Sequence, residues 1–179
     1  MQFFLDNDES KKKFSLMLAG EIMCELPIFV CIGSDRVVSD MIGPLTAEIM
    51  VKKYNIEAYV YGRLHNPIIA KNIKSAFRFL EKNYPNRQII VVDAGIGNLS
   101  DIGSVKLNKG GCIPAGAFGG NKVVYGDVSI MAMVSMLGIN EKTFLSCAKF
   151  NVIYNLAQNL AECINNAVKI SNYIRKEAV

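Results

Sequence analysis

The sequence has few of the residues that form most metal sites and most nucleophilic catalytic sites. It contains one histidine, no tryptophan and five cysteines, and no two of these cysteines are spaced as a CxxC pair. A zinc site of histidine and cysteine ligands and a disulfide framework are therefore both disfavoured. We expect free thiols in a reducing compartment. The lone histidine, His65, is more typical of a surface or capping residue than of a metal ligand.

Long apolar runs, a leader segment and clustered basic charge are lacking as well. No apolar run approaches the roughly 18 residues of a membrane-spanning helix, and the N-terminal segment has acids where a signal peptide has bases. The net charge of +4 is mild and reads as spread along the chain, unlike that of a nucleic-acid-binding surface. We expect a cytoplasmic protein without nucleic-acid or membrane partners.

The residues that are present indicate one folded α/β domain. Apolar residues make up 51% of the chain and charged residues 20%, as in ordinary globular domains. Three short apolar runs read as buried strands, at 28–32, 58–61 and 88–92. Helical periodicity lies between them, which predicts a largely parallel central sheet.

We expect a single domain over 1–179, with two terminal helical parts. Residues 1–26 are expected to form an N-terminal helical appendage. Residues 145–176 have apolar positions at three- and four-residue spacing, which predicts a C-terminal helix packed on the sheet. A glycine-rich loop is expected over 109–126, and Asn66-Pro67 is expected to begin the helix before the third strand.

Aspartates follow two of the predicted strands. Asp35 and Asp40 come soon after the first strand, and Asp93 is expected to end the third. Ligands of open α/β sheets bind at the carboxyl ends of the strands. If the two strands are neighbours, these carboxylates converge and serve as an acid and a base or as a site for a hard divalent ion. The structural alternative is a turn at Asp35, a helix cap at Ser39 or Asp40, and a strand end at Asp93.

Two other chemistries fit the pattern less well. The glycines after the strands form neither GxGxxG nor GxxxxGK[ST], which disfavours nucleotide binding. Cys112 and His65 are candidates for a nucleophile and its base, with Asp127 to orient the histidine, but their pattern is non-specific.

Four ordered segments carry a family resemblance over roughly residues 26–175. They are IGSDRVVSDMIGPLTAEIM, YGRLHNPI, VVDAGIGNLSDIGSV and KGGCIPAGAFGGNKVVYGDVSIMAMV. Together they resemble the YyaC-type sporulation proteins of endospore-forming Firmicutes, a family similar to the spore germination protease and to hydrogenase-maturation endopeptidases. The resemblance implies a three-layer α/β/α sandwich of the phosphorylase/hydrolase-like kind, located in the forespore or mother cell.

The same resemblance implies a function and its residues. Catalytic aspartates of the germination protease correspond to Asp40 and Asp93, so we expect a peptidase that acts on peptides or spore proteins. Asp40, near a helix N-terminus, is expected to be the more readily ionised, and Asp93 is the candidate for a raised pKa. The sequence has CIPAG where the germination protease has a histidine before the proline, so Ile113 replaces a metal ligand of the maturation endopeptidases.

The remaining expectations concern what the site binds. We expect no required cofactor, with a divalent metal bridging the two aspartates as the less favoured alternative. Asp35, His65, Gly116 and Gly119 are the candidate substrate-binding residues, because glycines let a backbone approach a peptide closely. The alternative function is a non-catalytic sporulation factor that binds a peptide or protein in the same cleft. The germination protease assembles, so a homo-oligomer is also expected.

Overall fold

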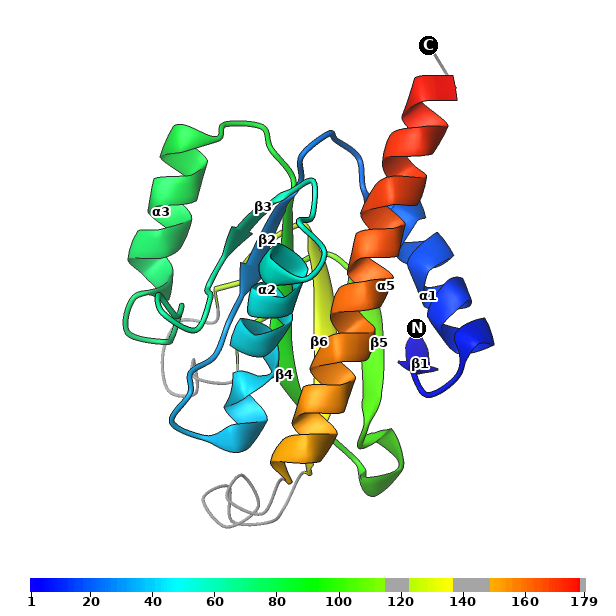
Figure 1. Cartoon of the computed structure of the whole chain (residues 1–179). Coiled ribbons are helices and arrows are strands. Elements are labelled where there is room, and N and C mark those ends of the chain that lie inside the picture. The colour runs from blue at the N-terminus through cyan, green and yellow to red at the C-terminus, as the bar shows by residue number, and fades with distance from the viewer. Residues whose placement is uncertain (115–122, 137–148, 178–179) are drawn as a thin grey trace.

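The computed structural model describes residues 1–114, 123–136 and 149–177, which form a mixed six-stranded sheet covered by helices (Figure 1). The strands are β1 (Gln2–Phe4), β2 (Ile28–Cys31), β3 (Tyr59–Tyr61), β4 (Ile89–Gly97), β5 (Ser104–Lys109) and β6 (Val128–Met136). The α-helices are α1 (Asp8–Glu21), α2 (Ile42–Lys52), α3 (Ile73–Asn83) and α5 (Phe150–Glu177). Two short 3-10 helices are η1 (Val38–Met41) and η2 (Leu99–Asp101).

The sheet order brings the first and third predicted strands together. The order is β1-β5-β6-β4-β2-β3, with parallel pairing from β6 through β4 and β2 to β3. β5 and β1 extend the sheet in antiparallel pairs. β2 and β4, whose adjacency was only a condition of the sequence argument, pair directly, from Ile28 opposite Ile89 to Cys31 opposite Val92. The carboxyl ends of these strands therefore lie at one edge of the sheet.

Helices cover both faces of the sheet, which confirms the predicted three-layer α/β/α class. In Figure 1, α1, α2 and α5 lie together on one face and α3 lies apart from them. The larger apolar core joins α1, α2 and α5 to one face of the strands. The smaller core joins Ile73, Phe77 and Leu80 of α3 to residues of the other face such as Val30 and Val91. Alternation of side chains along each strand serves the two cores in turn.

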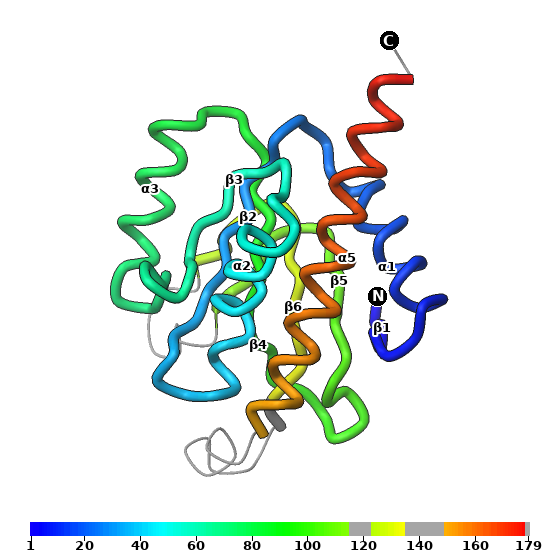
Figure 2. The backbone as a smooth tube through the Cα atoms, in the orientation of Figure 1, coloured from blue at the N-terminus to red at the C-terminus, as the bar shows by residue number. Residues whose placement is uncertain are grey.

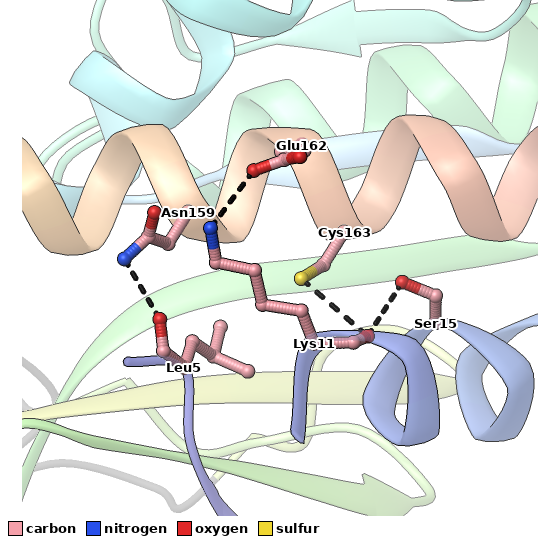
Figure 3. Close-up of polar contacts among 6 residues, drawn as sticks. All are labelled: Leu5, Lys11, Ser15, Asn159, Glu162 and Cys163. Atoms are coloured by element: carbon pink, nitrogen blue, oxygen red, sulfur yellow. Dashed lines mark hydrogen bonds and ion pairs between the residues drawn. The ribbon is translucent and has the colours of Figure 1, made fainter. Parts of the chain in front are cut away.

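The N-terminal segment is part of the main core. β1 adds an edge strand to the sheet, and Phe14 of α1 is fully buried in the larger core. Figure 3 shows the polar contacts between this segment and α5. Lys11 Nζ lies 3.1 Å from Glu162 Oε2, and Asn159 Nδ2 donates to the carbonyl oxygen of Leu5 over 2.7 Å. The first 26 residues thus contribute a strand and a packed helix, where we expected only a helical appendage.

Two predicted boundaries were wrong. β4 does not end at Asp93 but continues to Gly97, because β6 supplies pairing partners as far as Met136. Asn66-Pro67 does not begin a helix; α3 begins at Ile73. α5 is described from Phe150 on, and the expected helix start at residue 145 lies outside the described residues. The described ranges include no helix with the length and hydropathy needed to cross a bilayer.

Candidate active site

The loop after β2 is shaped by a glycine that packs against Asp40. Gly33 has φ of +134°, a conformation that residues with a side chain rarely adopt. A Cβ atom at Gly33 would overlap the backbone carbonyl oxygen of Asp40. The glycine therefore lets the chain fold back so that Asp40 lies against the end of β2. Figure 2 shows this loop at the edge of the sheet from which α2 begins.

The Asp40 carboxylate is oriented by Ser34 and does not cap α2. Its Oδ2 accepts hydrogen bonds from the Ser34 backbone N–H at 2.8 Å and from the Ser34 hydroxyl at 2.9 Å. The expected cap was wrong, because η1 runs directly into α2, whose first residue Ile42 follows Met41 without a side-chain cap. Ser39, the other expected cap, is fully buried and its hydroxyl has no partner among the described residues.

Asp93 lies within β4, on the face that α3 covers in part. It follows Val92, the last β4 residue that pairs with β2, and it lies opposite Met131 of β6. Its exposed fraction is 3%. Oδ1 accepts a hydrogen bond from the Ala94 N–H at 2.8 Å, whereas Oδ2 is buried without a partner among the described residues. A buried carboxyl oxygen without a hydrogen-bond partner is uncommon. Burying it costs less free energy when the carboxyl is protonated and uncharged.

The two aspartates interact electrostatically. Burial raises the pKa of Asp93 from 3.8 to about 8; the Ala94 N–H opposes this rise, and the negative charge of Asp40 adds to it. The direction is the one expected from the sequence. A carboxyl with this pKa carries its proton at neutral pH, so Asp93 is the candidate proton donor of the pair.

Cys112 is a buried neighbour that the sequence did not connect with Asp93. The residue is 9% exposed, and burial together with the charge of Asp93 raises the pKa of its thiol to about 12. A thiol with this pKa is not a nucleophile at neutral pH. His65 instead lies near Glu48, with Nδ1 4.0 Å from a carboxylate oxygen. Asp127 accepts a hydrogen bond from the N–H of Ile89, the first residue of β4. These contacts disfavour a Cys112–His65–Asp127 triad.

The other predicted site residues are not drawn into the aspartate pair. Asp35 is exposed, with no side-chain hydrogen bond among the described residues. His65 is 67% exposed on the loop after β3. Gly116 and Gly119 lie outside the described residues. Ser34, in contrast, was missed as a site residue, although its spacing of six residues before Asp40 is visible in the sequence.

The donor set does not fit a nickel site of the kind the resemblance implies. In the described ranges, no three or more His, Cys, Asp and Glu side chains are grouped to hold a metal ion. Ile113, at the position of the missing histidine, is an apolar side chain that is 44% exposed. The lone histidine is held beside Glu48. The described residues therefore offer two carboxylates at this site without an imidazole.

Comparison with known proteins places this architecture among related chains. A family model described as "Protein of unknown function (DUF1256)" matches residues 2–163. The "Uncharacterized protein YyaC" of Bacillus subtilis (strain 168) is 31% identical over 135 residues, which cover 75% of this chain and 66% of that protein. The match thus spans slightly less than two thirds of the relative's length.

A solved structure shares the fold. The [NiFe] hydrogenase maturation protease HycI from Thermococcus kodakarensis KOD1 superposes with a TM-score of 0.50 over 86% of this chain and 99% of its own chain. The sequence identity is 16%, so the similarity is one of fold. The α/β class predicted from the sequence is that of this protease.

Proposed function

The chain belongs to the DUF1256 protein family, and from this premise and the chemistry of its two aspartates we propose that it is an aspartate-dependent peptidase. The observation that carries the proposal is the buried Asp93 carboxyl, whose pKa is raised to about 8 beside the charge of Asp40. The maturation-protease fold supports a peptide or protein substrate. Two carboxyl groups in different protonation states can activate water and protonate a leaving group.

The two aspartates take different roles in the proposed reaction. The Asp40 carboxylate takes a proton from a water molecule, whose oxygen attacks the scissile carbonyl carbon. Asp93 donates its proton to the amide nitrogen as the carbon–nitrogen bond breaks. Proton transfer by positioned side chains of this kind contributes rate factors of about 10² to 10⁴. At the end the acid and the base have exchanged states, and proton exchange with solvent restores them.

Ser34 supports this division by fixing the orientation of Asp40. Both Ser34 donors bind the same oxygen, Oδ2. The other oxygen, Oδ1, accepts no hydrogen bond from a described side chain and is available to a water molecule. A positioned base is more effective than a rotating one, because the reacting atoms are already aligned.

The biological setting follows from the family resemblance. As a YyaC-type protein, the chain is proposed to act during sporulation, in the cytoplasm of the forespore or mother cell, on peptides or spore proteins. Assembly into a homo-oligomer belongs to the same proposal. Light scattering on the purified protein distinguishes a monomer from an assembly.

One observation favours a second candidate function. Asp93 is only 3% exposed, so a scissile bond has little direct access to its carboxyl. A non-catalytic sporulation factor that holds a peptide at Asp40 needs no such access. The two candidates differ in whether the bound peptide is cut.

The test is cleavage of fluorogenic peptides and of extracted spore proteins by wild-type protein and two variants. Asp40→Asn and Asp93→Asn are expected to lower the rate by at least about 10²-fold. The exposed Asp6→Asn, far from the loop of Asp40 in the sequence, serves as the control and is expected to retain most of the rate. Wild-type activity is expected to fall above about pH 8, where Asp93 loses its proton. Cleavage that survives either substitution contradicts the assignment, and peptide binding without any cleavage supports the second candidate.

A further inference from the structure

The positive charge of the chain is concentrated on and around α3, not spread along the sequence as expected. Residues 71–87 contain five basic residues and one acidic residue, Glu81. This excess of four equals the net charge of +4 of the whole chain. The rest of the molecule is therefore balanced in charge, and this segment stands out from it. A local excess of one sign creates a potential that attracts oppositely charged partners.

Four of these basic residues form a stripe along the outer face of α3 and the turn before it. They are Lys71, Lys74, Arg78 and Lys82. Lys74, Arg78 and Lys82 recur every four positions and so lie on one side of α3, and Lys71 lies in the turn two residues before the helix begins. All four are exposed, whereas Ile73, Phe77 and Leu80 bury the opposite side in the smaller core. Within the ranges described by the structure, none of the four is paired with a carboxylate, so their charge is available to a ligand.

An exposed aromatic ring lies beside the basic stripe. Phe79 is 50% exposed, and its ring centroid is 6.3 Å from that of Tyr61 on β3. The Tyr61 hydroxyl is 2.7 Å from the Tyr84 hydroxyl, which fixes the ring against which Phe79 leans. Aromatic side chains and arginine are enriched where proteins bind other proteins. The surface therefore offers an apolar contact next to its positive charges.

The stripe begins close to the aspartate site. The Ile68 carbonyl oxygen accepts a hydrogen bond from the N–H of Gly33 at 2.9 Å, so the loop before α3 borders the loop that carries Asp40. Lys71 follows Ile68 by three residues. In Figure 1, α3 starts at the same edge of the sheet as α2 and runs away from it. A polymer bound along α3 can therefore continue toward Asp40.

We propose that the basic stripe of α3, together with Phe79, is a docking surface for an acidic segment of a protein. The helical part of the stripe, from Lys74 to Lys82, extends about 12 Å, the rise of eight helical residues. About four residues of an extended polypeptide cover this length, and a fifth reaches toward Lys71. Their carboxylates meet the four basic residues, and an apolar side chain among them packs on Phe79.

Polypeptide is favoured over nucleic acid by the charges at the end of the stripe. Asp35 and Asp40 lie at the edge where the stripe begins. A nucleic acid carries a phosphate at every unit and is repelled where it passes these carboxylates. A polypeptide can place its acids along α3 and an uncharged stretch over the carboxylate edge. Phe79 likewise suits an apolar side chain better than a phosphate.

The test is a binding measurement, which needs no cleavage and is therefore independent of the proposed peptidase activity. The probe is a fluorescent ten-residue peptide that combines four glutamates with two leucines, and its counterpart has lysine in place of glutamate. Two triple variants remove three positive charges each from exposed positions. They are Lys74→Gln with Arg78→Gln and Lys82→Gln, and, as the matched control, Lys12→Gln with Lys13→Gln and Lys169→Gln.

The wild type and the control variant are expected to bind the acidic peptide, with affinity that falls as salt rises. The α3 variant is expected to bind about tenfold more weakly, from three lost charge contacts. Phe79→Ala is expected to weaken binding with an unchanged salt dependence. Equal losses in both triple variants, equal binding of the lysine peptide, or tighter binding of duplex DNA or anionic vesicles than of the acidic peptide would each overturn the proposal.

Discussion

Replacing Asp93 with asparagine tests the burial of this carboxyl through stability. In the folded protein the pKa of Asp93 is raised from 3.8 to about 8. Between these values the folded state holds a proton that the unfolded chain has released, so the free energy of unfolding falls as pH rises. The expected slope is about 1.4 kcal/mol per pH unit, which gives roughly 4 kcal/mol at pH 7. Asparagine has nearly the same shape and does not ionise.

The expected result is a variant that is more stable than the wild type, by an amount that depends on pH. Asp93→Asn and wild type should differ little in pH dependence below pH 4, and the variant's advantage should grow up to about pH 8 and then level off. Urea unfolding at several pH values, followed by circular dichroism, measures this difference. The exposed Asp35→Asn is the control, for which a flat difference is expected. A flat difference for Asp93→Asn as well would refute the reasoning. Substitutions at functional sites often raise stability while they lower activity.

Two further predictions concern the glycine turn before Asp40 and the ion pair of Arg63 with Glu48. Gly33→Ala is expected to lower the free energy of unfolding by about 2–3 kcal/mol, because the new Cβ overlaps the Asp40 carbonyl in a strained backbone conformation. Gly103→Ala, also at positive φ but with open space around it, should cost about 1 kcal/mol; equal losses in urea unfolding would contradict the packing argument. Arg63→Lys is expected to cost about 1 kcal/mol, because it breaks the two-bond contact with Glu48. Hydrogen bonds from Arg63 and then from Lys52 lower the pKa of Glu48 from 4.5 to about 2. The stability that these contacts contribute is therefore present above pH 4.5 and is lost as pH falls toward 2, so an Arg63→Lys loss that is the same at pH 2 and pH 6 would argue against it.

The parallel core of the fold was predictable because its strands are short apolar runs with clear ends. The parallel sheet followed from the order of elements, whereas the pairing of β2 with β4 was only a condition of the sequence argument, and the structure supplies it. The length of β4 did not, because it depends on β6, which carries pairing on past Asp93 to Gly97. The residues around Asp93 do not predict the length of the partner strand β6, which is distant in the sequence. The residue expected at a strand end therefore lies within a strand.

The start of α3 was mispredicted for a similar reason. Asn66-Pro67 has the composition of a helix start, but Ile68 instead forms a bridge with Ile32 beside β2. The helix starts after Asn72, whose side chain accepts from the Ile69 N–H at 2.7 Å and donates to the Pro67 carbonyl oxygen at 3.0 Å. A long-range contact thus overrides a local signal.

Of the candidate site, the two aspartates could be named from sequence, whereas the groups that set their states could not. The raised pKa of Asp93 comes mainly from burial, which depends on packing by residues distant in sequence. The role of Ser34 depends on a left-handed turn at Gly33. Asp35, more conspicuous in the sequence than Asp40, is an exposed residue of the loop.

The packing of α5 has a consequence for how the protein folds during synthesis. η1, which carries Asp40, packs against α5, and α5 also packs against α1 near the other end of the sequence. These contacts join residues made early in translation to a helix made about 110 to 150 residues later. Contacts between such distant residues form slowly and leave apolar surface exposed until they close. We therefore expect a nascent chain to bury its main core and position Asp40 only after α5 has left the ribosome.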